Sequence, residues 1–384
     1  MKIFKKTLIS LLTVGCVGAF ALQAAACDFL SASEPTETPD EHTHTFHQKL
    51  VEVQYEKTPA TCAQDGVYFK SCSCGEKGEE TFTTPALPHT GAICELCLQD
   101  VSSQGLEYTL SSDGKSYRLS GAGTCTDERL YIPSTYNGLP VVMFDSSAFY
   151  QSAYLTHITV PDSVTLIANA TFFNCWNLQS FVVPDSVQSL GFNLFYECGN
   201  LSEITIGSGV QSIGQYAFYG CNSLKTVRYT GDIAGWCAIK FVNHNSNPTC
   251  KGANLYINGE LLTALTVPES VTKLHDYAFQ YCLSLEQITT LNTLQSIGSF
   301  AFTNCKDLTS VNVSLSVSEI GYGTFSGCES LTSVAFASGK DWFVTTSEQD
   351  FQNKVNGTLV DVSDATQAAI YLKDTYTEYY WYAV

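Results

Sequence analysis

Seven cysteine and histidine side chains in the first 100 residues are candidate metal ligands. Thiolates and imidazoles are the ligands that tetrahedral Zn²⁺ prefers, and Cys94-x-x-Cys97 has the spacing of a zinc knuckle. The full set is Cys62, Cys72, Cys74, Cys94, Cys97, His44 and His89. The sequence predicts either a structural zinc held by four of them within residues 42–98, or disulfide bonds among the cysteines, which small exported domains favour. A catalytic zinc is not expected, because no nearby motif supplies a general base.

Cys27 is a candidate for a different modification. A basic start and an apolar run precede the small residues at 24–26, which stand directly before Cys27. This order is that of a secretory signal, and the residues before Cys27 resemble a bacterial lipobox, in which the cysteine is lipidated. We therefore expect residues 1–27 to be a lipoprotein signal peptide and Cys27 to carry the lipid anchor. The alternatives are secretion with Cys27 unmodified, and lipidation at Cys16.

Two segments separate this signal from the rest of the chain. Residues 28–44 are rich in Ser, Glu, Pro and Thr, with little to bury, and are expected to be a disordered tether. Residues 45–100 hold the metal-ligand candidates and are expected to form a small Cys/His module. So short a unit buries little surface, and cross-links or a metal would help it fold.

Composition and motifs exclude several classes of function. The net charge of −18, with only 19 Lys+Arg, repels phosphate backbones, so no nucleic-acid partner is expected. The sequence contains no phosphate-binding Gly-rich loop, no Gly-x-Ser-x-Gly and no His-Glu-x-x-His. We therefore expect a protein that is not an enzyme.

From Leu155 onward the sequence repeats itself every 23 residues. The full copies are residues 155–177, 178–200, 201–223, 262–284, 285–307 and 308–330. A fixed period of this length predicts a leucine-rich-repeat solenoid. We expect an α/β-type repeat solenoid over residues 155–339, whose leading strands stack into one parallel β-sheet on one side.

Each copy has apolar residues at fixed positions. In the first copy, Leu155, Ile158 and Val160 predict a leading strand with one buried face, and Phe172 and Cys175 are expected to close the coil from the opposite side. The repeated cysteines are interpreted as a buried ladder of free thiols. Parallel stacking points their side chains the same way, which is a poor geometry for disulfide bonds.

Residues that flank the central apolar position of each leading strand are expected to face solvent. Most are small and polar, as in any solvated strand. The candidate ligand face consists of His157, Thr159, Glu203, Thr205, Arg228, Gln287 and Thr289. A solenoid offers an extended surface with few deep pockets, so a protein or a polysaccharide is expected to bind there rather than a small molecule.

The unit Leu-x-x-Ile-x-x-Pro-x-x-Val-x-x-Ile-Gly-x-x-Ala-Phe-x-x-Cys resembles the BspA-like leucine-rich repeats of bacterial surface proteins, over about residues 127–340. The Cys/His stretch also resembles a small module found in such proteins. Departures from the repeat are local: Gly207, Leu291 and Ser314 replace the turn proline, and His275 replaces the usual glycine. The resemblance implies a cell-surface adhesin or interaction module.

Both ends of the solenoid are expected to be capped. Residues 104–154 are predicted to form an N-terminal cap with a hairpin that turns at Asp113-Gly114. Residues 340–384 are predicted to form a C-terminal cap with a short helix after Ser363 and an aromatic end that packs on the last coil.

Residues 229–261 are an insertion in the repeat series. Asn258-Gly259 predicts a two-residue hairpin within it, and Cys237 and Cys250 are a candidate disulfide pair. Insertions in solenoids often map to a binding side; the alternative is a spacer.

Together these features predict an exported protein of the cell envelope, held on the membrane by its N-terminal lipid alone. It is expected to recognise an extracellular or host protein, or a glycan, through the solenoid sheet. The alternatives are a structural envelope scaffold without a specific ligand and a wall-directed hydrolase.

Overall fold

The computed structural model describes residues 48–50, 54, 56–58, 66–71, 77–84 and 102–384. Strands β1 (Glu56–Thr58), β2 (Gly66–Ser71) and β3 (Lys77–Thr84) form a small sheet in the order β1-β2-β3. β1 pairs antiparallel with β2. These strands lie in the segment where the small Cys/His module is expected.

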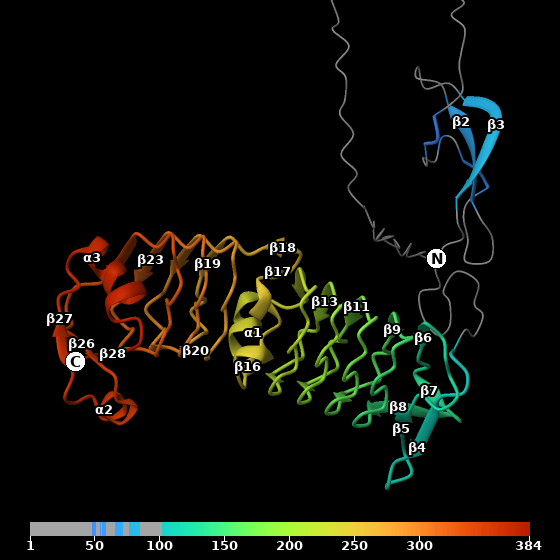
Figure 1. The fold of residues 1–384 in the computed structure, drawn as a ribbon, viewed down its shortest axis with the longest axis horizontal. Helices are drawn as coiled ribbons and strands as arrows, with labels where there is room; N and C mark the ends of the chain where they lie inside the picture. The colour runs from blue at the N-terminus through green and yellow to red at the C-terminus, as the bar shows by residue number, and fades with distance from the viewer. Residues whose placement is uncertain (1–47, 51–53, 55, 59–65, 72–76, 85–101) are drawn as a thin grey trace, which may run out of the picture. The chain divides into compact units, whose positions relative to one another are not determined.

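The chain from residue 102 onward forms a solenoid of stacked coils, as the repeat predicts (Figure 1). Each coil begins with a short leading strand whose central residue is buried. The leading strands are β6 (Arg129–Tyr131), β9 (His157–Thr159), β11 (Ser180–Val182), β13 (Glu203–Ile206), β15 (Thr226–Tyr229), β17 (Asn254–Ile257), β19 (Ala264–Thr266), β21 (Gln287–Thr289), β23 (Ser310–Val313) and β25 (Ser333–Phe336). We call residues 155–223 the N-terminal series and residues 262–330 the C-terminal series.

The return side of each regular unit holds a two-residue strand and turns in place of a helix. These return strands also stack in parallel, so the solenoid has a second line of sheet. They are β10 (Leu166–Ile167), β12 (Ser189–Leu190) and β14 (Ser212–Ile213) in the N-terminal series, and β20 (Lys273–Leu274), β22 (Ser296–Ile297) and β24 (Glu319–Ile320) in the C-terminal series. On the turn side, backbone hydrogen bonds join successive coils, as from Phe172 N to Leu194 O at 3.0 Å.

The leading strands form three separate parallel ladders, not the one continuous sheet that the repeat predicts. They are β6-β9, then β11-β13-β15-β17, then β19-β21-β23-β25. At the first gap, β9 and β11 still meet through a hydrogen bond of 3.0 Å from Gln179 N to Thr156 O. At the second gap, β18 (Glu260–Leu261) folds back antiparallel on β17 and covers its outer edge. A hairpin that follows a leading strand directly therefore ends the ladder.

Ladders of identical side chains fill the core. Phe172 stacks on Phe195 with ring centroids 5.6 Å apart, and Phe302 stacks on Phe325 at the same distance. The repeat cysteines are buried and unpaired, as predicted. Except at Cys282, their thiols donate to the carbonyl oxygen of a phenylalanine one coil earlier, as Cys198 Sγ does to Phe172 O at 3.1 Å. Each coil thus buries its neighbour's apolar side, which no isolated unit can do.

The usual glycine of the repeat stands where two coils touch. A Cβ atom on Gly191 would lie 2.6 Å from the carbonyl carbon of Ala168 on the preceding coil, so a side chain does not fit there. The exceptions are Ala168, in the first regular unit, and His275, in the unit that follows residues 229–261. Both units stack on a coil that is itself irregular.

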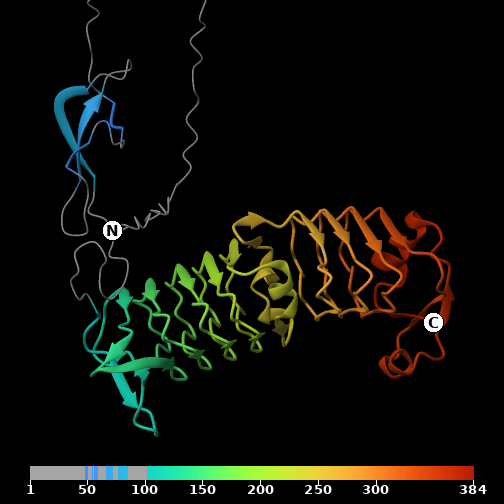
Figure 2. The same ribbon diagram turned by 180° about the vertical axis from the view of Figure 1, so that it is seen from behind.

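Residues 229–261 form an irregular coil of the solenoid. β15 pairs in parallel with β17, so Tyr229 lies opposite Ile257. Between them lie α1 (Ile233–Ala238), β16 (Lys240–Phe241), η2 (His244–Ser246) and η3 (Pro248–Lys251). In both ribbon views α1 lies between the two series (Figures 1 and 2). The segment therefore continues the stack as a coil of its own.

Two local predictions for this coil have opposite outcomes. The hairpin at Asn258-Gly259 is confirmed: it joins β17 to β18, and both residues have positive φ, 51° and 85°. The candidate disulfide is wrong, because Cys237 and Cys250 are both free and buried.

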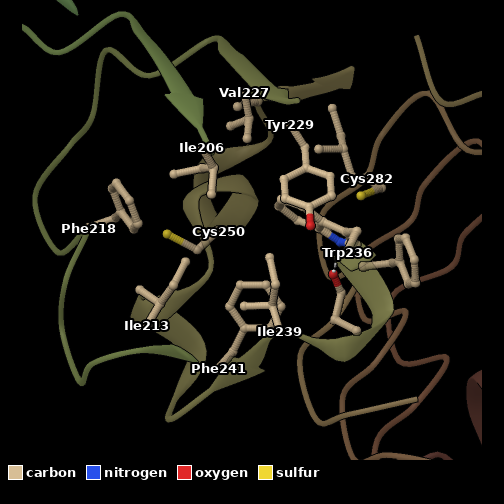
Figure 3. Close-up of a cluster of buried hydrophobic side chains, with 14 of the residues drawn as sticks. Ile206, Ile213, Phe218, Val227, Tyr229, Trp236, Ile239, Phe241, Cys250 and Cys282 are labelled. Carbon is tan, nitrogen blue, oxygen red and sulfur yellow. Dashed lines mark hydrogen bonds between the residues drawn. The ribbon is translucent and has the colours of Figure 1, made fainter. Parts of the chain in front are cut away.

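Trp236 fills the centre of the irregular coil, among the buried side chains of Figure 3. Its ring centroid lies 5.5 Å from that of Tyr229 and 5.6 Å from that of Phe241. The indole Nε1 donates to Ala278 O at 2.9 Å, drawn as a dashed line in Figure 3. Ala278 belongs to the first unit of the C-terminal series, so Trp236 connects the irregular coil to that series.

A buried polar cluster makes the same connection through side chains of Asn247, Thr249 and Gln280, and we call it the clasp. Asn247 Nδ2 donates to Tyr277 O at 2.7 Å, and Thr249 Oγ1 donates to Gln280 O at 2.6 Å. His244 Nδ1 lies 2.7 Å from Gln280 Oε1. Buried polar groups are tolerated when they are hydrogen-bonded, and here they fix the irregular coil against the C-terminal series.

The N-terminal end is closed by a hairpin of β4 (Glu107–Leu110) and β5 (Tyr117–Gly121). The predicted turn is confirmed, with Gly114 at φ 69°. β5 pairs in parallel with β8 (Leu139–Phe144), and β7 (Thr135–Tyr136) pairs antiparallel with β8. The cap thus extends the return-side sheet, whose order is β16-β14-β12-β10-β8-β5-β4.

The C-terminal end is closed by a mixed cap. Its elements are β26 (Trp342–Thr345), α2 (Glu348–Asn353), β27 (Thr358–Val360), α3 (Ala365–Ile370), the π-helical turn η4 (Tyr371–Thr375) and β28 (Tyr380–Ala383). β28 pairs antiparallel with β24, the last regular return strand. The predicted packing of the aromatic end is therefore confirmed, with Trp381 only 1% exposed. The helix cap is Asp364 rather than Ser363, because the Asp364 carboxylate accepts the Thr366 N–H at 2.9 Å.

Candidate binding surface

The outward side chains of β6, β9, β11, β13, β15 and β17 form a surface that we call the leading-strand face. Its first part surrounds His157 and Thr159 on β9. A hollow of about 250 Å³ lies there, lined on either side by Arg129 of β6 and Ser180 of β11. It coincides with the gap between the first two ladders, where no full strand pairing joins β9 to β11.

The imidazole of His157 is half-buried on this surface. Burial, and then the nearby Arg129 guanidinium, lower the pKa of His157 below its ordinary value. The ring is therefore neutral near pH 7. Its Nδ1 lies 3.1 Å from Thr156 Oγ1, so Nε2 is the ring nitrogen that remains to meet a ligand.

Glu203, Arg228 and Tyr256 form the most organised part of the face. Arg228 Nε lies 2.6 Å from Glu203 Oε1, and its guanidinium carbon lies 4.8 Å from the centroid of the Tyr256 ring. Thr205 and Tyr256 are the cross-strand neighbours of Arg228. An exposed ion pair contributes little stability, but two partners on opposite sides hold the guanidinium in one orientation.

Gln287 and Thr289 do not belong to this surface. They lie on β21 in the third ladder, and the hairpin of β17 and β18 ends the second ladder before that one begins. Their cross-strand neighbours are Ala264 and Thr266 on β19 and Ser310 and Asn312 on β23. The candidate ligand face is thus divided among three ladders, with His157 and Thr159 on the first, and Glu203, Thr205 and Arg228 on the second.

Three prominent side chains of the face are absent from the predicted set: Arg129, Tyr131 and Tyr256. The alternation around the buried Leu130 on β6 would have placed Arg129 and Tyr131 outward. Tyr256 was less accessible to prediction. Its strand lies within the insertion. Tyr256 and Arg228 are 28 positions apart, and they become cross-strand neighbours only because the chain between them folds as one coil.

The other predicted sites lie outside the described residues. These are Cys27 and the metal-ligand candidates Cys62, Cys72, Cys74, Cys94, Cys97, His44 and His89. Within the described residues, no group of three or more His, Cys, Asp and Glu side chains is placed to hold a metal ion. Nor does any helix in that part of the chain have the length and apolar character needed to cross a membrane.

The buried thiols of the repeat are not arranged for chemistry. Burial raises the pKa of the Cys175, Cys282 and Cys328 thiols to about 12. The thiolate is the reactive form of cysteine, so these side chains are inert at neutral pH. Their role is packing.

Solved structures of bacterial leucine-rich repeat proteins are similar to this chain. A leucine-rich repeat protein of T. pallidum is 21% identical, with 61% of this chain and 91% of that one covered and a TM-score of 0.34. One from Bacteroides ovatus is 24% identical, with 62% and 72% covered and a TM-score of 0.37. The pneumococcal vaccine antigen PcpA is 14% identical, with 74% and 73% covered and a TM-score of 0.30. No curated protein sequence matches significantly.

The family is established by the repeats themselves. The profile of the BspA type leucine rich repeat region matches residues 142–246 and 252–366 in 6 copies, which is more than half of the chain. Proteins with this repeat are typically found on bacterial surfaces. The solenoid, its ladders of Phe and Cys and this match lead to one conclusion: the chain belongs to the BspA-type leucine-rich repeat family.

Proposed function

We propose that this chain is a cell-surface binding protein that recognises an extracellular protein through the leading-strand face. The carrying observation is Arg228, oriented between Glu203 and Tyr256 on an exposed sheet. Arginine and tyrosine are enriched among the residues that dominate protein–protein binding energies. A guanidinium that is already held in place loses less side-chain freedom on binding.

The rest of the face supports the same class of ligand. The His157 hollow adds an imidazole and the Arg129 guanidinium, and Val182, which is 58% exposed, adds an apolar contact. This mixture of charged, aromatic and apolar groups on an open surface suits a protein better than a small molecule. No catalytic step forms part of the proposal.

An array of extracellular proteins and glycans tests this function. Saturable binding of a protein probe is expected, and Arg228→Ala should weaken it at least tenfold, since residues of this kind contribute more than about 1.4 kcal/mol. Lys306→Ala is the matched control, because Lys306 forms a similar exposed ion pair with Glu329, at 2.8 Å, in the C-terminal series. A chain that binds no probe would instead be an envelope scaffold. Release of sugars or peptides from cell-wall material would indicate a hydrolase.

The proposal includes anchoring at the cell surface through a lipid on Cys27. The signal-like order of residues 1–27 supports it. Membrane fractionation of cells that express the full chain is the test. The chain is expected in the membrane fraction, and Cys27→Ala should release it into the medium. An unchanged distribution of that variant would contradict the anchor and leave the binding proposal intact.

A further inference from the structure

A groove of about 360 Å³ runs over the return strands β10, β12 and β14, away from the leading strands. We call it the return groove. Its floor follows the glycine position of the repeat, occupied by Gly191 and Gly214. A Cβ on Gly191 would lie 2.6 Å from the Ala168 carbonyl carbon, so close stacking itself keeps this line free of side chains.

Phe192 lies in the return groove with 53% of its side chain exposed. Its Cδ1 is only 2.7 Å from the point that a Cβ on Gly214 would occupy, so the ring rests on the backbone of the next coil. Val242, at the end of the groove, is 55% exposed. An aromatic ring that is supported from below and open above can stack on a ligand.

Polar groups stand beside this ring. Ser189 and Ser212 are in-register neighbours on β12 and β14, and they point outward because Leu190 and Ile213 are buried. Within the described part of the chain, neither serine hydroxyl has a hydrogen-bond partner. Asn169 accepts the Phe192 N–H at 2.9 Å through Oδ1, which leaves its amide NH₂ group to donate.

Tyr216 and Tyr219 extend the aromatic surface beyond the groove. They are 40% and 38% exposed and meet edge to face, with centroids 6.2 Å apart. The backbone of Tyr216 is left-handed, with φ 57°, and the same turn position holds Asn193 and Gly323 in two other units and the aromatic Tyr277 and Phe300 in two more. Bulky residues rarely adopt this conformation, so the turn does not require a tyrosine there.

The chemistry of the groove narrows the class of ligand. Every residue that lines it is uncharged, although the chain carries a net charge of −18. Sugar rings present faces of C–H groups, which pack on aromatic rings, and hydroxyl groups, which bond to serine and amide groups. Ser189 and Ser212 stand in register on neighbouring coils, at the spacing of about 4.8 Å between neighbouring strands, with Leu166 before them and Lys240 after them. The pair follows the solenoid axis, as a polymer laid in the groove would.

We propose that the return groove binds a neutral polysaccharide chain that runs along the solenoid axis. Phe192 stacks on a sugar ring, and Ser189 and Ser212 hydrogen-bond to sugar hydroxyl groups. This site is separate from the leading-strand face and does not depend on the function proposed for that face.

The C-terminal series lacks the same surface. Charged Lys273 and Glu319 flank Ser296 at the position that Ser189 and Ser212 hold in the N-terminal series, and His275 stands where that series has Ala168. Tyr322, the counterpart of Phe192, has its ring centroid 5.5 Å from that of Tyr380 of the C-terminal cap. The C-terminal cap and the charged side chains thus occupy, in the C-terminal series, the surface that remains open in the N-terminal series.

Affinity electrophoresis of the whole chain tests the proposal. The gels contain a soluble β-glucan, α-glucan, mannan or galactan, with alginate as the polyanion. At least one neutral polymer should retard the protein, and alginate should not. Phe192→Ala should weaken the interaction about tenfold, which corresponds to about 1.4 kcal/mol. Tyr216→Asn should weaken the interaction less. Asparagine is a residue that this turn accepts, so weaker binding by this variant would not come from a folding defect.

Arg228→Ala serves as the control from the leading-strand face and should bind the polymer as the parent chain does. The proposal is overturned if no neutral polymer is bound, if Phe192→Ala binds as tightly as the parent chain, or if Arg228→Ala weakens binding equally. Because the protein probes report on Arg228 and the polymers on Phe192, failure of one proposal is distinguishable from failure of the other.

Discussion

The two series of regular units share a core and differ in what they present to solvent. Phe195 and Phe302, with their stacked neighbours, are buried in the same way. One position after the core phenylalanine, the N-terminal series has stacked aromatic rings, such as Tyr196 on Tyr219 with centroids 4.7 Å apart. The C-terminal series has polar residues there instead: Gln280, which is buried in the clasp, and the partly exposed Thr303 and Ser326. The repeat thus fixes the residues that stacking requires and leaves the outward residues free to diverge, which is where recognition develops.

The leading strands show the same contrast. The second ladder carries the Glu203–Arg228–Tyr256 arrangement, whereas the third exposes mainly Ser, Thr, Asn, Gln and Ala. The irregular coil lies between these ladders. The insertion supplies Tyr256 and so completes the surface of the second ladder. It also ends that ladder, and so separates this surface from that of the third ladder.

The largest expected effect tests whether the cores are equivalent. Phe195→Ala and Phe302→Ala each remove a fully buried ring from a ladder. Each should lower the free energy of unfolding by about 3–5 kcal/mol. Denaturant titration followed by circular dichroism measures both. Losses that differ by more than about 2 kcal/mol would show that the two cores are not equivalent in packing.

Thiol reactivity tests the same equivalence in a different way. Cys175 and Cys282, one from each series, have pKa values raised by burial from 9.0 to about 12. At pH 8 the thiolate fraction, and with it the rate of labelling, should be about a thousandfold lower than in the unfolded chain. Peptide mapping after labelling with an aromatic disulfide identifies each site. Rapid labelling of either residue in the native protein would show an open core.

These thiols also make stability depend on pH. Their pKa values are higher in the folded chain than in the unfolded one, so the folded state binds more protons. Their contribution to stability is complete below pH 9 and is lost as the pH rises from about 9 towards 12.

An intermediate effect is expected at the clasp. Asn247→Ala removes the donor to Tyr277 O and the acceptor for Thr249 N, and should cost about 1–3 kcal/mol. It should also uncouple the series, so that unfolding occurs in two steps. Hydrogen exchange resolves the two series, and the exposed Asn222→Ala is the control. A single cooperative transition for Asn247→Ala would mean that the remaining contacts, of Trp236 with Ala278 and of Thr249 with Gln280, suffice to couple them.

The smallest effect concerns the strained turn at Tyr216. Tyr216→Asn should raise the free energy of unfolding by about 1 kcal/mol, because asparagine tolerates the left-handed conformation better. The reverse change, Asn193→Tyr, should lower it. Thermal melting measures both. Destabilisation by Tyr216→Asn would show that the contact with Tyr219 outweighs the strain.

The 23-residue period was sufficient to predict the coils, the Phe and Cys ladders and the outward position of Arg228. All of these follow from contacts that repeat identically. The period did not predict the division of the sheet. The hairpin at Asn258-Gly259 was recognisable from the sequence, but it ends the ladder only because β17 pairs with β15, and the repeat does not specify that pairing. Nor did it reveal the return groove, which arises where Phe192 lies on a glycine of the next coil.

A binding measurement on two matched variants tests most directly whether recognition belongs to the N-terminal side of the solenoid. Arg228→Ala and Gln287→Ala each shorten an outward side chain, on the second and third ladder respectively. With a protein probe bound by the parent chain, Arg228→Ala should raise the dissociation constant at least tenfold, and Gln287→Ala should leave it unchanged. Equal weakening by both variants, or weakening by Gln287→Ala alone, would contradict the assignment.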